Sequence, residues 1–234
     1  MSHGNNLTPN DVIADVRELI QDTTGNQFGA TTTPTRYTDT ELLGFVNQTI
    51  KRMLILRPDL FSTITNITTT ANTVVQTLPS DSYRLVELYS VQNGNVLTEV
   101  NRESLDQSYP AWVSDPAGTP YNYMRHTRHP NKYFLYPRPI SNIVLVGEYI
   151  QVPANYAAGA NITVLPDAYL PVLVDGTVFL AESIDDEHVN SGRAKLFLES
   201  FSQALGAGLS SRVLTDTEQA GIPPVNPRLQ RQVI

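Results

Sequence analysis

The chain has 234 residues, of which 41% are hydrophobic, so it is long enough to bury a core without covalent staples. It contains no cysteine, which excludes disulfides, thiolate metal sites and thiol catalysis, and its formal net charge of -7 argues against sequence-independent binding to nucleic acids. No apolar stretch approaches the roughly 20 residues of a membrane-spanning helix, and the N-terminus lacks a signal-peptide pattern, so neither membrane insertion nor export by a cleaved peptide is expected.

Two capped helices are predicted at the start of the chain. Thr8, Pro9 and Asp11 form a capping-box pattern, and apolar residues then recur at helical spacing from Val12 to Ile20. Thr38 and Glu41 repeat the box, and Pro58 ends the second helix. The inward stripe of this second helix is predicted to consist of Leu42, Val46, Ile50 and Met53.

Short strands are predicted between Leu60 and about Leu165, where threonine, valine and tyrosine alternate with Asn, Gly and Pro. Asn93-Gly94 between two apolar runs indicates a tight hairpin. The sheet is expected to be antiparallel, with strands over 62–69, 74–78, 85–91, 121–126, 133–136 and 143–152.

Helical periodicity returns after Pro166, with the regular helix starting or bending at Pro171. Residues 173–184 are so apolar that burial on more than one side is expected, and contact with neighbouring subunits would explain it. A last helix carries Ala194, Phe201 and Leu205 on one face, is expected to end near Gly206 and Gly208, and is followed by a proline-rich tail. The predicted fold class is α+β: a four-helix bundle-like lobe (1–60 and 165–211), an inserted, mainly antiparallel β lobe (61–164) and an extended C-terminal arm (212–234).

No motif with recognised chemistry is found, so no catalytic residue, metal or cofactor is predicted and the chain is not expected to be an enzyme. The acidic cluster at 185–188 has poor spacing for a metal site and is interpreted as a solvated corner. The basic and aromatic run at 125–134 could contact phosphates, but its pattern favours a polar hairpin tip. An acidic or neutral surface would also suit the wall of a channel through which DNA slides without sticking.

The order of several short landmarks is more specific than any one of them. They are Arg36-Tyr-Thr-Asp-Thr-Glu-Leu-Leu, Asn47, Arg57-Pro58-Asp59-Leu60, Gln76-Thr-Leu-Pro79, Leu105-Asp106, Tyr109-Pro-Ala-Trp112, Phe134-Leu-Tyr-Pro137, Leu165-Pro-Asp-Ala-Tyr169 and Ala181-Glu-Ser-Ile-Asp-Asp-Glu187. Together, over residues 36–205, they resemble the head-to-tail adaptor (connector) proteins of tailed bacteriophages. The long loop at 21–34 departs from this likeness.

The resemblance implies a structural virion protein in the neck between head and tail, assembled in the host cytoplasm. Such a protein forms a ring, commonly of twelve subunits, that joins the portal protein to a tail nozzle or tail-tube protein and lets double-stranded DNA pass without specific binding. It implies inter-subunit helices carrying Leu42, Val46, Ile50, Leu173, Thr177 and Leu180. It also implies a portal-docking arm with Arg212, Ile222, Pro223, Val225, Arg228, Leu229 and Arg231.

Two alternatives stay open from the residues themselves. One is a tail-tube or baseplate structural protein. The other is a carbohydrate-binding or hydrolytic tail module, in which Trp112 and the tyrosines would stack on sugars. Hydrolysis would require two carboxylates facing a cleft, whereas the acidic residues here fall mainly in caps, turns and helix corners.

Overall fold

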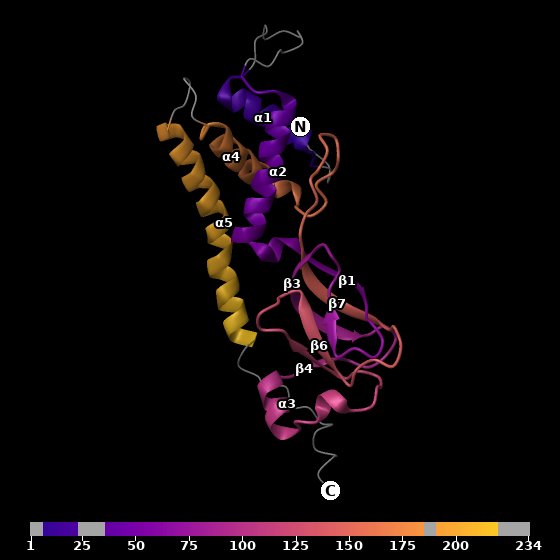
Figure 1. Cartoon of the computed structure of the whole chain (residues 1–234). Coiled ribbons are helices and arrows are strands. Elements are labelled where there is room, and N and C mark those ends of the chain that lie inside the picture. Colours follow the sequence, from indigo (N-terminus) through magenta and orange to yellow (C-terminus); the bar gives the residue numbers. More distant parts are fainter. Residues whose placement is uncertain (1–6, 23–35, 185–190, 220–234) are drawn as a thin grey trace. The chain divides into compact units, whose positions relative to one another are not determined.

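The computed structural model describes residues 7–22, 36–184 and 191–219, with side chains described at all of these except 191 and 207–219. The chain divides into two compact units: a helical unit of residues 8–49 and 167–234, and a β unit of residues 1–7 and 50–166. Figure 1 shows the elements of each unit. The mixed α+β class is confirmed, while the four-helix bundle stays a prediction.

The two predicted helix starts are confirmed. Helix α1 (Pro9–Ile20) begins after Thr8, whose hydroxyl accepts the amide of Asp11 while the Asp11 carboxylate accepts the amide of Thr8 at 2.8 Å. Helix α2 (Asp39–Leu56) begins with the same exchange between Thr38 and Glu41. It ends before Pro58, and a 3-10 turn (Pro58–Phe61) follows.

Helix α4 (Leu170–Ala181) is the central element of the helical unit. It packs against α1 and α5. At Gly176 the absence of a side chain brings it close to Thr49 of α2 and Phe201 of α5. From the sequence, contact with neighbouring subunits was expected to explain the apolar character of this helix. Burial inside one chain accounts for it instead.

Helix α5 spans Ser191–Gln219, and its length differs from the sequence-based expectation. The helix continues through Gly206 and Gly208 instead of ending there. Glycine lowers helix propensity by only about 1 kcal/mol relative to alanine, so a single position does not end a long helix. An extended arm starting at 212 is therefore wrong for residues 212–219, and residues 220–234 lie outside the described part of the chain.

The β unit contains two mostly antiparallel sheets. The first has the order β1-β7-β3, with β1 at Ser62–Thr68, β7 at Val144–Gln151 and β3 at Ser82–Val91. The second has the order β2-β6-β5-β4, with β2 at Val75–Thr77, β6 at Lys132–Tyr136, β5 at Asn122–Arg125 and β4 at Thr98–Glu99. The β4–β5 pair is parallel, which the sequence did not predict.

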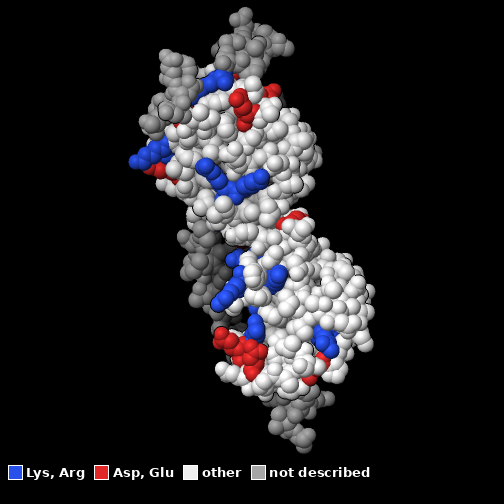
Figure 2. Space-filling model, viewed as in Figure 1, with Lys and Arg blue, Asp and Glu red and all other residues white. Residues whose placement is uncertain are grey.

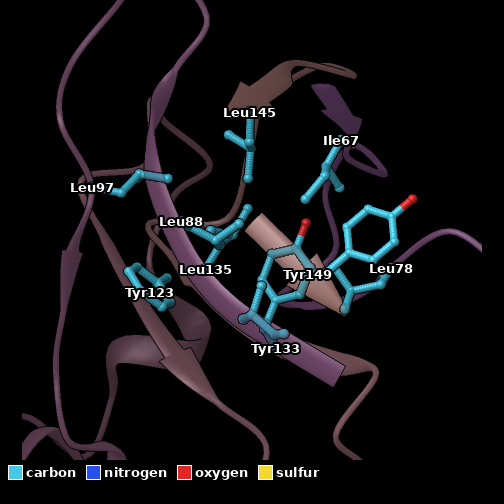
Figure 3. Close-up of a cluster of buried hydrophobic side chains, with 10 residues drawn as sticks. Ile67, Leu78, Leu88, Leu97, Tyr123, Tyr133, Leu135, Leu145 and Tyr149 are labelled. Carbon is cyan, nitrogen blue, oxygen red and sulfur yellow. The ribbon is translucent and has the colours of Figure 1, made fainter. Parts of the chain in front are cut away.

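The core of the β unit lies between the two sheets (Figure 3). Ile67 of β1, Leu88 of β3 and Leu145 of β7 face Tyr123, Tyr133 and Leu135 of the second sheet. Because successive strand residues point to opposite faces, Met124 and Phe134 point away from this core. There they pack with Trp112 under a segment that contains helix α3 (Arg102–Ser108) and a 3-10 turn (Trp112–Ser114).

The predicted hairpin after β3 is also confirmed. Asn93 has a left-handed φ of 56°, and the amides of Gly94 and Val91 donate to the carbonyls of Val91 and Asn95. An antiparallel bridge pairs Ser90 with Val96.

Candidate functional site

The six side chains predicted on inter-subunit helices are buried within one chain. The exposed fraction is 0% for Leu42, Val46, Leu173 and Thr177, 1% for Ile50 and 8% for Leu180. Thr177 donates its hydroxyl to the carbonyl of Leu173 at 2.7 Å, so even this polar side chain is satisfied internally. An inter-subunit role of α2 and α4 stays a prediction, and any such contact would have to use exposed side chains.

The residues predicted for the docking arm lie outside the described side chains. Arg212 lies on helix α5, but its side chain is outside the described set. Ile222, Pro223, Val225, Arg228, Leu229 and Arg231 all lie beyond the last described residue. The acidic cluster at 185–188 is likewise outside the described residues.

Trp112 is not available to stack on a sugar. It is only 3% exposed, and its indole N–H donates to Asp106 at 2.7 Å. Its ring makes edge contacts with Phe134 and Tyr136. The interpretation of Trp112 as a carbohydrate platform is therefore wrong, because an aromatic platform must be open to solvent.

The basic run at 125–134 forms the β5–β6 hairpin and its tip. Arg125 is held by Glu99 at 2.9 Å. The ring of His126 stacks on Phe134 with a centroid distance of 5.3 Å, and its Nδ1 accepts the backbone amides of Arg128 and His129. Partial desolvation, followed by the charges of nearby cationic groups, lowers the pKa of His126 below its usual 6.5. These contacts agree with a structured polar hairpin tip.

A groove that the sequence did not predict lies between α1 and α4, with a volume of about 380 Å³. Its apolar lining includes Leu19, Leu170 and Pro171, and its carboxylates are Asp15, Glu18 and Asp175. Asp175 accepts the hydroxyl of Ser200 from α5 at 2.6 Å. The sequence signal for this groove is that the apolar Leu19 falls beside Asp15 and Glu18, and all three are exposed on α1.

A second surface, also missed from the sequence, lies on the last two turns of α2. Lys51, Arg52, Ile55 and Leu56 are all exposed, and Ile55 has an exposed fraction of 72%. Their spacing of three and four residues places them on one side of the helix. Figure 2 shows basic side chains gathered over this part of α2.

Neither a metal site nor a membrane span is found where the structure describes the chain. Across residues 7–22, 36–184 and 191–219, no three His, Cys, Asp or Glu side chains are grouped so that they could hold an ion. Of the helices in those ranges, none is long and apolar enough to cross a bilayer.

Comparison with known families identifies the class of protein as a phage structural adaptor. The family model described as SU10 adaptor protein matches residues 8–228, which is nearly the whole chain. The chain belongs to the SU10 adaptor protein family, a family of phage head-to-tail adaptors that is not a class of enzymes. A search of curated proteins gave no match.

Proposed function

We propose that this chain forms a ring that joins the portal of the phage head to the tail and encloses a segment of the DNA channel in the virion neck. The observation that carries the proposal is the adaptor family match over residues 8–228. The proposed partners are the portal protein on one side, a tail nozzle or tail-tube protein on the other, and further copies of the chain. Double-stranded DNA would pass without specific binding.

The charges of the described residues support passage without binding. Three arginines are held by carboxylates of the same chain: Arg17 by Asp22 at 2.6 Å, Arg57 by Asp59 at 2.8 Å and Arg125 by Glu99 at 2.9 Å. The net charge of -7 adds an overall repulsion of phosphates to this local neutralisation. Such a surface would not hold DNA in place.

The C-terminal segment is the proposed portal contact. It combines the apolar residues Ile222, Val225 and Leu229 with Arg228 and Arg231, and 220–234 contains no acidic residue. Arginine is among the residue types that contribute most at protein interfaces, and the aliphatic side chains supply apolar surface that docking would bury. Because α5 runs to Gln219, a truncation after that residue tests the segment while leaving the helix whole.

The test is cosedimentation of the purified protein with the portal ring of the same phage. The truncated chain should keep its helical circular dichroism and lose portal binding, and Arg228→Glu/Arg231→Glu should weaken binding strongly. The matched control is Arg128→Glu/Lys132→Glu at the β5–β6 tip, which makes the same charge change and should bind normally. Unchanged binding by the truncated chain would disprove the docking role of the segment.

A further inference from the structure

The α1–α4 groove and the exposed side of α2 are complementary in charge and in chemistry. The groove has three carboxylates around an apolar floor formed by Leu19, Leu170 and Pro171. The α2 side presents two cations next to two exposed aliphatic side chains. We infer that the groove of one copy receives the Lys51, Arg52, Ile55 and Leu56 side of α2 from the next copy. This inference rests on the proposed ring and names the surfaces that would close it.

The chemistry of the groove favours a basic and apolar occupant over other kinds. Asp15 and Glu18 are exposed on α1, and Asp175 reaches the same groove from α4. Arg193 of α5 donates to the backbone carbonyl of Leu19 and lies over the ring of Phe197, whereas the described lining of the groove itself carries three carboxylates and no Lys or Arg. The local charge is therefore negative, and an ammonium or guanidinium group from another chain would be attracted.

The chemistry of the α2 surface fits that requirement. An isoleucine with 72% of its surface exposed is costly in water, and Leu56 beside it is 47% exposed. Burying these two side chains on Leu19, which is 41% exposed, would remove apolar surface of both copies from water. Lys51 and Arg52 flank the aliphatic pair, as the carboxylates flank the floor of the groove.

The geometry of such a contact generates a ring. The two surfaces differ from each other, so every copy offers one groove and one α2 side, and the contact is heterologous. Heterologous contacts repeat from copy to copy and close into rings when the rotation between copies divides a full turn. Each closed ring would then contain as many identical contacts as subunits.

Charge reversal tests the pairing. Asp15→Lys/Glu18→Lys should abolish self-association through the groove, and Lys51→Glu/Arg52→Glu should abolish it through α2. An equimolar mixture of the two variants should associate again, because the intact groove of one variant meets the intact α2 side of the other, and the two reversed surfaces are again opposite in charge. Arg128→Glu/Lys132→Glu is the matched control and should behave as the natural chain. Sedimentation velocity at low and high salt measures each mixture, and association should weaken as salt screens the charges.

The lack of natural cysteines gives a second readout that detects weak association. Two single-cysteine chains, Leu19→Cys and Ile55→Cys, should form a disulfide-linked dimer much faster when mixed than either chain does alone, with oxidised glutathione added as the two-electron oxidant. Equal rates in the mixture and in the separate chains, or reversal variants that associate as the natural chain does, would overturn the pairing. If the natural chain neither self-associates nor binds portal rings, the proposed adaptor function fails instead.

Discussion

Gly176 of α4 lies against both α2 and α5, and Gly176→Ala tests the packing of these three helices directly. A Cβ there would lie 2.5 Å from Cγ2 of Thr49 on α2 and 2.8 Å from Cε2 of Phe201 on α5. Both distances are far below the roughly 3.5–4.0 Å of an ordinary carbon–carbon contact. Neither neighbour is a long flexible side chain, so α2 or α5 must move.

The magnitude follows from two opposing effects. Replacing glycine by alanine inside a helix stabilises it by about 1 kcal/mol. Overpacking a buried position costs about 1–3 kcal/mol. Gly176→Ala should therefore lower the free energy of unfolding by up to about 2 kcal/mol.

Gly44→Ala is the matched control, because it makes the same change inside α2. No atom lies within 4 Å of its added Cβ, so only the gain in helix propensity of about 1 kcal/mol is expected. Urea unfolding followed by circular dichroism at 222 nm measures both variants. A Gly176→Ala chain that is as stable as Gly44→Ala would refute the close approach of α2, α4 and α5.

Three further predictions concern single groups. The hydroxyl of Tyr133 is buried without a hydrogen-bond partner, so Tyr133→Phe should raise the free energy of unfolding of the β unit by about 1 kcal/mol. Tyr149→Phe loses a hydrogen bond to a carboxylate at 3.2 Å and should lower the free energy of unfolding. Urea unfolding followed by tryptophan fluorescence measures both variants. Asp22→Asn should lower the melting temperature and cost about 2 kcal/mol, because the buried guanidinium of Arg17 loses one carboxylate at 2.6 Å and keeps only that of Asp39; stability equal to the natural chain would contradict the ion pair. Folding lowers the pKa of His126 from 6.5, so the fold favours the neutral ring. The contribution of His126 to stability should therefore be fully present above pH 6.5 and be lost as the pH falls through the folded pKa. Lys132→Gln should raise this pKa in an NMR titration, and an unchanged value would show that the nearby charge has no effect.

The helix starts and the hairpin were predictable because the interactions that form them are local. A capping box joins residues three apart, and a two-residue turn depends on the left-handed preference of Asn-Gly. Both features are therefore determined by a few consecutive residues. By contrast, the parallel β4–β5 pair joins residues about two dozen positions apart, and nothing in either short strand specifies that partner.

The site residues show where sequence reasoning reached its limit. The apolar stripes of Leu42 and Leu173 correctly predicted burial, but periodicity does not say whether the covering surface belongs to the same chain or to another. The structure shows that the same chain covers them. The groove carboxylates were invisible for a related reason, because Asp15 and Asp175 come together only when α1 packs on α4.

Negative-stain electron microscopy of the purified chain, with and without the portal ring of its phage, tests the adaptor function most directly. The proposal predicts rings of the chain alone or portal particles thickened at one end when the chain is added. Portal particles that stay unchanged in the presence of excess folded chain would contradict it.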